Sequence, residues 1–180
     1  SNSPRRKELL SGLGLCYEVK TLPGIEESYP DTLSGEEIPV FIACEKADAY
    51  RQTMHSDELI ITADTIVWLD GLVMGKPEDE EDARRMLRCL SGKTHQVITG
   101  VCLTTTEFQK SFATVTDVTF AELTEEEIDY YVQKYKPMDK AGSYGIQEWI
   151  GFVGVEGITG SYFNVMGLPI QRLYKELKKL

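Results

Sequence analysis

Two adjacent arginines near the start of the chain are well suited to binding phosphate. Arg5 and Arg6 follow Ser3-Pro4, a typical helix start, since Ser can cap free backbone amides and Pro suits the first turn. The free amides and the dipole of such a helix end attract anions. Two solvated surface charges are the alternative, but cations in a first helical turn oppose the dipole unless an anion binds there. The pair therefore predicts a phosphate site.

Asp64 is the second candidate, because it directly follows the apolar run 59–63. An aspartate at the end of a buried strand must face a cleft, a metal or a hydrogen-bonding turn. A local turn assisted by Thr65 would explain the same two residues. The motif alone does not decide between a catalytic and a structural carboxylate.

Three further segments carry residues that could bind parts of a nucleotide. Lys76 lies in the constrained turn Gly75-Lys76-Pro77, and residues 139–147 combine Lys140, several small residues and Gln147. An amide such as that of Gln147 can read donor and acceptor groups on a base. The pairs Glu26-Glu27 and Glu45-Lys46 offer carboxylates for Mg²⁺, which needs only one or two from the protein when phosphates complete its coordination. Taken singly, each segment is equally compatible with an ordinary surface or loop.

Composition bounds the class of protein. A chain of 180 residues with 42% hydrophobic content can bury the core of one compact domain. The net charge of -10 argues against extended contact with nucleic acid or an anionic membrane, so a phosphate site must be local. No apolar run reaches the ~18 residues of a membrane span, and no secretory pattern opens the chain. We therefore expect a cytoplasmic protein without nucleic-acid or membrane partners.

The cysteines and the first residue give two minor expectations. Cys16, Cys44, Cys89 and Cys102 lie in apolar stretches without metal-ligand spacing, which predicts buried free thiols in a reducing cytosol. The sequence opens at Ser1 without methionine, so we expect a few residues to precede it.

Helices and strands must place these side chains. Strands are predicted at 16–20, 59–63, 66–69, 72–74, 95–103 and 111–123, with shorter β-like pieces at 152–153 and 162–166. Helices are predicted from Ser3-Pro4 to Gly12 or Gly14, and over 35–55, 78–90, 124–136 and the residues after Pro169. Asp70-Gly71 predicts a two-residue hairpin, and Thr124 with Glu127 has the spacing of a capping box. Alternating helices and strands with tight hairpins indicate an α/β fold with a mixed twisted sheet and flanking helices.

The ordered combination of motifs resembles the Maf family of nucleotide pyrophosphatases over essentially the whole chain. The matching motifs are Ser1-x-Ser3-Pro4-Arg5-Arg6, Glu27, Lys46-Ala47, Ala63-Asp64-Thr65, Gly75-Lys76-Pro77, Leu90-Ser91-Gly92 with His95, Asp139-Lys140-Ala141-Gly142-x-Tyr144-Gly145-Ile146-Gln147, and Gly167-Leu168-Pro169. The resemblance implies an α/β fold with a deep cleft, in one domain over 1–180 or in two lobes around that cleft. It also implies hydrolysis of nucleoside triphosphates between the α and β phosphates with a divalent cation, Mg²⁺ or Mn²⁺, and a homodimer.

The resemblance assigns roles by position. Asp64 stands at the place of the proton acceptor, and Asp64 and Glu27 are the implied metal ligands. The implied substrate-binding residues are Ser1, Arg5, Arg6, Glu27, Lys46, Thr65, Lys76, Lys140 and Gln147. Residues 139–147 are similar to the branch that prefers dTTP and UTP, in which the positions of Arg6, Thr65 and Gln147 are tied to base choice; modified pyrimidine nucleotides are further candidate substrates. Glu148 departs from the family, which usually has glycine there.

Two other classes of function compete with this hypothesis. A nucleotide-sensing module linked to cell division would bind triphosphate, with hydrolysis incidental. A general phosphatase would release inorganic phosphate first. Pyrophosphate as the first product distinguishes the predicted enzyme from both.

Overall fold

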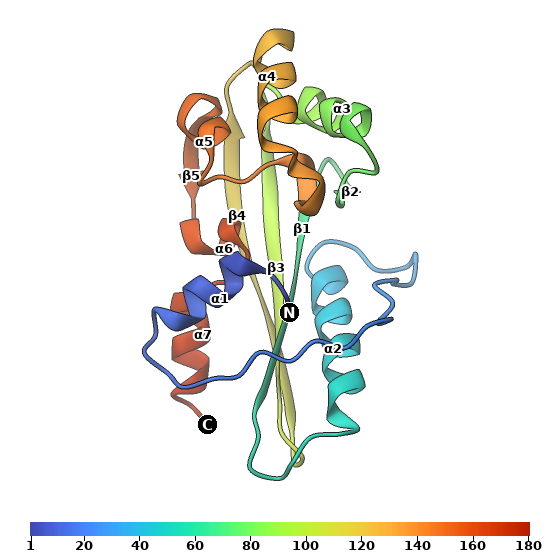
Figure 1. Cartoon of the computed structure of the whole chain (residues 1–180), viewed down its shortest axis with the longest axis vertical. Helices are drawn as coiled ribbons and strands as arrows, with labels where there is room; N and C mark the ends of the chain where they lie inside the picture. Colours follow the sequence, from blue (N-terminus) through green and yellow to red (C-terminus); the bar gives the residue numbers. More distant parts are fainter. The chain divides into compact units, whose positions relative to one another are not determined.

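The structure is a computed structural model that describes all residues, 1–180. It is an α/β fold in which helices flank a five-stranded antiparallel sheet of order β2-β1-β3-β4-β5 (Figure 1). The elements are α1 Pro4–Ser11, α2 Glu37–Arg51, β1 Ile60–Leu69, β2 Leu72–Met74, α3 Glu80–Leu90, β3 Thr94–Thr104, β4 Gln109–Phe120, α4 Glu125–Tyr135, η1 Pro137–Asp139, η2 Ala141–Ser143, α5 Trp149–Gly154, β5 Val155–Thr159, α6 Tyr162–Met166 and α7 Ile170–Leu177. The predicted α/β class with flanking helices is confirmed. The prediction of a mixed sheet is wrong, because the strands pair in antiparallel fashion, as at the hairpin of β1 and β2 and between β4 and β5.

The chain divides into two compact units, each described by itself. Unit 1 comprises Ser1–Thr65, Ile98–Thr114 and Phe163–Leu180, and unit 2 comprises Ile66–Val97 and Val115–Tyr162. The long strands β1, β3 and β4 each contribute residues to both units.

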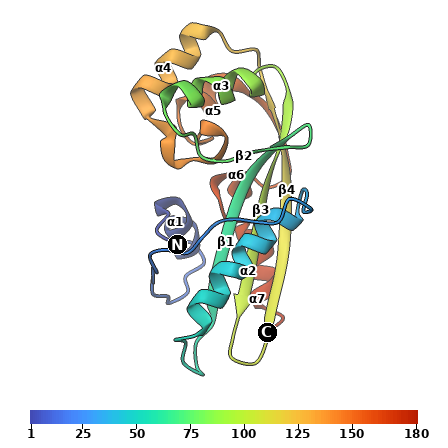
Figure 2. The ribbon, with the colours of Figure 1, turned by 90° about the vertical axis from the view of Figure 1, so that its right-hand side faces the viewer.

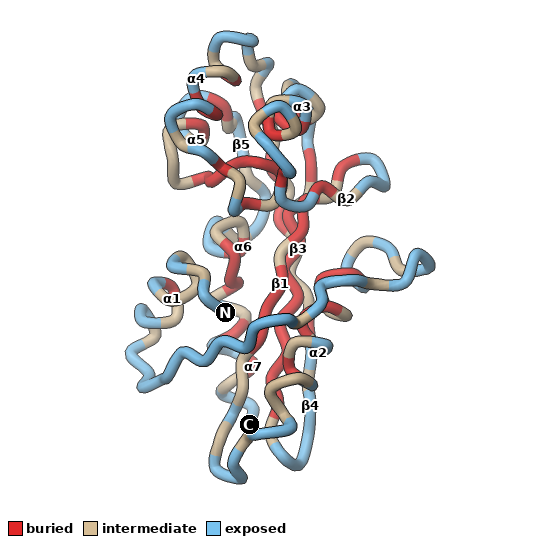
Figure 3. Tube along the Cα trace, turned by 45° about the vertical axis from the view of Figure 1, so that its right-hand side comes forward, coloured by how far each residue is buried: buried red, intermediate tan, exposed pale blue.

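Unit 1 packs helices on two faces of its strands. On β3, Val101 and Leu103 join the cluster of α1 and α7, whereas Cys102 between them packs against α2. This alternation is the period of two expected for a strand buried on both faces. Figure 3 shows the resulting long buried stretches along β1 and β3. At Gly100 an added Cβ would lie 2.4 Å from the backbone of Pro39, so glycine allows α2 to approach β3.

Unit 2 gathers α3, α4, α5 and the short η helices, and Figure 2 shows α3 and α4 side by side, as Figure 1 does. Its helix starts follow local chemistry. Asp79 caps α3 by accepting a hydrogen bond from the amide of Asp82, and Thr124 and Glu127 form the predicted capping box of α4. Asp70 and Gly71 have φ of 50° and 81°, as the predicted hairpin between β1 and β2 requires.

Several local predictions are wrong. Residues 16–20 are exposed and form no strand, because no neighbouring strand pairs with them. The β-like pieces at 152–153 and 162–166 belong to the short helices α5 and α6, since runs this short do not distinguish helix from strand by periodicity. Asp64 does not end a strand, because β1 continues through it to Leu69.

The cysteines are all free, as predicted, but their burial differs from the prediction. Cys102 is buried, Cys44 and Cys89 are half-buried, and Cys16 is exposed in the segment that forms no strand. No helix has the length and apolar character needed to cross a membrane.

Candidate functional site

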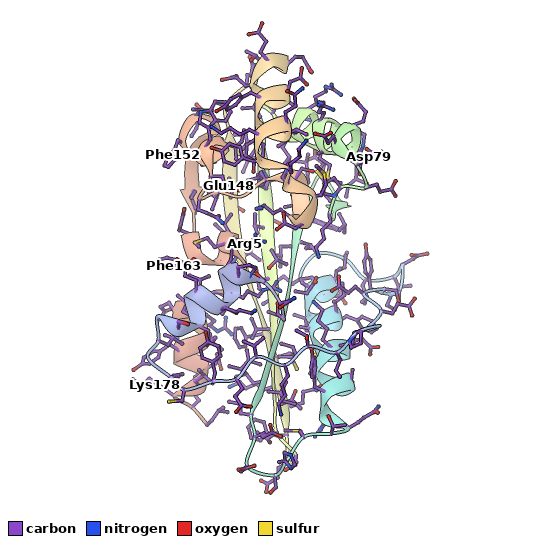
Figure 4. The ribbon with its side chains drawn as sticks, viewed as in Figure 1. Arg5, Asp79, Glu148, Phe152, Phe163 and Lys178 are labelled. Atoms are coloured by element: carbon purple, nitrogen blue, oxygen red, sulfur yellow. The ribbon has the colours of Figure 1, made fainter.

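The start of α1 is built as the sequence predicts. The Ser3 hydroxyl accepts a hydrogen bond from the Arg6 amide at 3.3 Å, Pro4 occupies the first turn, and no acidic residue lies there. Arg5, labelled in Figure 4, and the next residue, Arg6, thus sit in the first turn of the helix. Ser1 lies beside them, with its hydroxyl accepting from the Ser3 amide at 3.2 Å. This end of α1 combines free amides, two guanidinium groups and a hydroxyl, all of which favour an anion.

Arg6 is fixed by contacts distant in sequence. Its Nε donates to the carbonyl of Gly167 at 2.8 Å, and its Nη2 donates to Oγ1 of Thr65 at 3.0 Å. The Thr65 hydroxyl in turn lies 2.8 Å from that of Thr99 on β3. Burial lowers the pKa of Arg6, while Asp64 raises it. Arg6 therefore holds its charge in one orientation next to β1.

Asp64, Lys46 and Glu27 form a chain of charges in unit 1. Lys46 extends from α2, and its Nζ lies 3.5 Å from Oδ1 of Asp64 and 3.1 Å from Oε1 of Glu27. The same ammonium donates to the carbonyl of Ala63 at 3.2 Å. Asp64 is 9% exposed, so its carboxylate is largely removed from bulk solvent but is not sealed off from it.

The pKa of Asp64 reflects two opposing effects. Burial raises the pKa of this carboxyl above its usual range, and the charges of Lys46 and then Arg6 lower it. A carboxylate balanced in this way can take up a proton more readily than an exposed aspartate while the cations still favour its ionised form. Such a group is suited to general-base chemistry.

The donor set here is compatible with a divalent cation. Asp64 and Glu27 both contact the Lys46 ammonium, and no cluster of three or more His, Cys, Asp or Glu side chains with metal-site geometry exists. Mg²⁺ needs only one or two protein carboxylates when substrate phosphates and water complete its shell. Two carboxylates therefore fit a cation that arrives with a phosphate ligand.

Unit 2 contains the remaining predicted residues. Lys76 is exposed, and the carbonyl of the preceding Gly75 accepts a hydrogen bond from the Gly142 amide at 3.1 Å, which joins this turn to the 139–143 segment. Lys140 is 8% exposed, and its Nζ lies 3.0 Å from Asp139 and 3.8 Å from Glu148. Much of the Lys140 charge is thus balanced within the protein.

Gln147 has an unusual environment. Its Oε1 is buried and has no hydrogen-bond partner. A buried acceptor without a partner costs free energy, and such an atom is a candidate contact for a ligand. Its neighbour Glu148, labelled in Figure 4, accepts a hydrogen bond from Tyr131 at 2.6 Å. Glu148 is therefore held within unit 2 by its contacts with Tyr131 and Lys140.

Sequence reasoning missed several of these contacts. Thr99 and the Gly167 carbonyl support Arg6 and Thr65, and Tyr131 links Glu148 to the Gly145 amide at 2.9 Å. None carries a local signal, because each partner lies on another element. The sequence shows Gly167-Leu168-Pro169 as a motif. It does not show that the Gly167 carbonyl accepts a hydrogen bond from Arg6, which lies 161 positions away.

A cavity of about 780 Å³ in unit 1 touches Ser1 and Arg6 but is not the centre of this chemistry. Most of its lining is apolar, from residues such as Leu10, Leu15 and Ile61, and neither Asp64 nor Lys46 lines it. We therefore define the candidate site by the charged cluster rather than by this cavity.

Together, the fold and site define an α/β protein with a cationic helix start beside a buried, lysine-paired aspartate. Comparison with known proteins identifies the family: the Maf-like protein family matches residues 1–180, and the chain belongs to it. A protein of Phocaeicola vulgatus is 81% identical over 180 residues, and one of Bacteroides fragilis is 72% identical, each alignment covering 100% of this chain and 93% of the relative. A protein of Porphyromonas gingivalis is 55% identical, and the alignment covers 99% of this chain and 90% of the relative. All three relatives are named dTTP/UTP pyrophosphatase.

Proposed function

We propose that this chain is a nucleoside triphosphate pyrophosphatase that hydrolyses dTTP and UTP to the monophosphate and pyrophosphate. The observation that carries the proposal is the placement of the buried Asp64 carboxylate 3.5 Å from the Lys46 ammonium, next to the cationic start of α1. Full-length relatives named dTTP/UTP pyrophosphatase support the substrate class. Both units would belong to one catalytic domain over 1–180.

Each residue has a role that follows from its chemistry. A triphosphate brings several negative charges to an acidic protein, and Arg5, Arg6 and Lys46 of unit 1 and Lys76 of unit 2 would supply positive charge to bind it. Ser1 adds a hydroxyl donor beside Arg6. Charge compensation and positioning then provide most of the catalysis, as is general for phosphoryl chemistry.

Asp64 is the proposed proton acceptor. A water that attacks the α phosphorus loses its proton to the Asp64 carboxylate, while the bond to pyrophosphate breaks and the cations hold the leaving group. Lys46 keeps Asp64 ionised before the step. Asp64 and Glu27 would hold the divalent cation, Mg²⁺ or Mn²⁺, which when bound would neutralise phosphate charge and polarise the phosphorus centre.

The remaining residues concern the choice of base. Gln147 has a buried acceptor without a partner, and we propose that a base supplies the missing donor. Thr65 contributes to base choice through its hydrogen bond with Arg6, and Lys140 supports binding from the same unit as Gln147. Modified pyrimidine triphosphates are additional candidate substrates. We also propose a cytoplasmic homodimer, for which light scattering and localisation of a fluorescent fusion are the tests.

The deciding experiment separates the products. The full chain is incubated with dTTP, UTP and purine triphosphates in Mg²⁺ or Mn²⁺, and pyrophosphate and inorganic phosphate are measured independently. We expect pyrophosphate in equal amount to monophosphate, preferentially from dTTP and UTP, and no turnover in a chelator. Phosphate as the first product would indicate a general phosphatase. Saturable nucleotide binding without product would indicate a sensor.

A further inference from the structure

Cys44 and Cys102 are two thiols that the proposed hydrolysis does not use. Cys44 lies on α2 and Cys102 on β3, within a small cluster that also contains Ala43 and Ala47 of the helix. Their Sγ atoms are 3.6 Å apart. Both residues belong to unit 1, and 58 positions separate them in the sequence. The fold therefore brings the two sulfurs into direct contact.

The two thiols differ in access. Cys44 is half-buried, whereas Cys102 is fully buried. Cys102 also contacts the Thr104 hydroxyl at 3.5 Å. A small molecule from solvent can thus reach Cys44 first, with Cys102 directly behind it.

The more accessible thiol, Cys44, is also the more acidic of the two. The hydrogen bond with Cys102, assisted by one with Ser111, lowers the pKa of Cys44 to about 7, against the opposing effects of burial and of Asp48 and Glu45. The same pairing, together with burial, raises the pKa of Cys102. Because the thiolate is the reactive form, Cys44 is the nucleophile of the pair. The nearby carboxylates disfavour anionic reagents and leave a small neutral oxidant as the best match.

We propose that Cys44 is an oxidation site for neutral peroxides and that Cys102 is its resolving thiol, so that oxidation ends in an intramolecular disulfide. First, the Cys44 thiolate attacks one peroxide oxygen, the O–O bond breaks, and the products are a sulfenic acid and hydroxide, which takes a proton to become water. Next, the Cys102 sulfur attacks the Cys44 sulfur, the S–O bond breaks, and the hydroxide leaves as water with the Cys102 proton. With hydrogen peroxide, two thiols are oxidised and the peroxide is reduced to two waters; an organic hydroperoxide gives one alcohol and one water instead.

Closure requires only a short movement. The sulfurs must approach from 3.6 Å to the ~2.05 Å of a disulfide. The helix that carries Cys44 is already held against β1, because the Thr62 hydroxyl donates to the Ala43 carbonyl at 2.7 Å and Lys46 donates to that of Ala63. The bond would thus add a covalent link between α2 and β3.

The test is oxidation of the folded, reduced full chain with hydrogen peroxide in small excess, followed by alkylation and mass mapping of peptides. We expect the four alkylatable thiols to fall to two and a peptide pair joined through Cys44 and Cys102. Exposed Cys16 and half-buried Cys89 serve as internal comparisons, and the variants Cys16→Ser and Cys89→Ser should still form the bond. Four thiols remaining, or oxidation confined to Cys16, would overturn the proposal.

Two variants test the order of the steps. Cys102→Ser should stop the reaction at a sulfenic acid on Cys44, which a cyclic dione reagent traps, and Cys44→Ser should leave Cys102 reduced. Trapped sulfenic acid on Cys102 in place of Cys44 would contradict the assigned roles. Circular dichroism establishes that each variant is folded, and the wild-type peptide map tests the disulfide without any variant.

Discussion

Two buried ionisable groups, Asp64 in unit 1 and His95 in unit 2, are handled in opposite ways. Asp64 has Lys46 at 3.5 Å and the charge of Arg6 nearby, so that cations oppose the effect of its burial. His95 lies edge-on to the rings of Phe120 and Tyr144, with centroids 5.2 and 5.4 Å away, and its Nε2 lies 2.5 Å from the Tyr144 hydroxyl. Burial alone lowers the pKa of His95 to about 4.

This difference indicates a catalytic role for the ionised Asp64 and a structural role for the neutral His95. Cations around a buried carboxylate keep it ionised and able to exchange a proton, which is useful in catalysis. A histidine kept neutral among aromatic rings contributes packing and a hydrogen bond instead. We therefore expect changes at Asp64 to affect turnover, and changes at His95 to affect stability.

The largest expected effect is that of Asp64→Asn. Asparagine has nearly the same shape but cannot accept the proton, so kcat for pyrophosphate release should fall about 10³-fold while nucleotide binding persists. Steady-state kinetics and calorimetric titration with dTTP measure the two quantities. Asp57→Asn, at an exposed position of the same unit, is the matched control. Unchanged turnover in the Asp64 variant would remove this residue from the mechanism.

The pH dependence of unfolding tests the structural role of His95. Because the folded pKa of His95 is about 4 and the usual value is 6.5, the unfolded chain takes up a proton that the folded chain does not as pH falls below 6.5. Stability should be full above pH 6.5 and decrease toward pH 4, by about 3 kcal/mol at the lower limit. Both tryptophans, Trp68 and Trp149, lie in unit 2, so that their fluorescence follows the unit that contains His95.

The two histidines of the chain allow a direct control. His55→Gln, at an exposed site in unit 1, should leave the pH dependence between 4 and 6.5 as in the wild type. His95→Asn should lower stability at pH 7 and flatten that dependence. If the His95 variant keeps the same pH dependence of stability, other groups cause that dependence.

The sequence allowed prediction of features that depend on neighbouring residues. The cap at Ser3, the Asp70-Gly71 hairpin and the capping box at Thr124 are each set within four residues, and the structure has all three. The strand at 16–20 was predicted wrongly because its pattern requires a partner strand that the local sequence does not specify. Tertiary pairing, not propensity, decides such segments.

For the candidate site, the sequence identified residues but not their arrangement. Asp64 and Lys46 were recognised from motif order, yet their contact spans β1 and α2, and the support of Arg6 by Thr65 spans 59 positions. Side-chain contacts between elements depend on packing geometry that no local pattern contains. The prediction that Asp64 ends a strand was wrong for the same reason. The local sequence does not show that β1 continues past Asp64 to Leu69.

A somewhat smaller effect is expected for Lys46→Met, which sharpens the account of Asp64. Since the Lys46 charge lowers the pKa of Asp64, its removal should raise that pKa further and move the acidic limb of the pH–activity profile to higher pH. Loss of a phosphate contact adds to this, so kcat/KM should fall about 100-fold at pH 7. Lys20→Met breaks an ion pair with Glu58 at the surface of the same unit and should leave activity unchanged. An acidic limb at the wild-type position would contradict the role given to Lys46.

The smallest effect, about tenfold in KM for dTTP, is expected for Gln147→Leu. The buried Oε1 of Gln147 has no partner in the protein, so replacing the amide by a similarly sized apolar side chain removes an unsatisfied acceptor and should leave stability unchanged or raise it. If a base supplies the missing donor, binding must lose that hydrogen bond, worth about 1.4 kcal/mol for a tenfold change. Gln133→Leu, at an exposed position of α4, is the control. A variant with lower stability and unchanged KM would place Gln147 with His95, as a structural residue of unit 2.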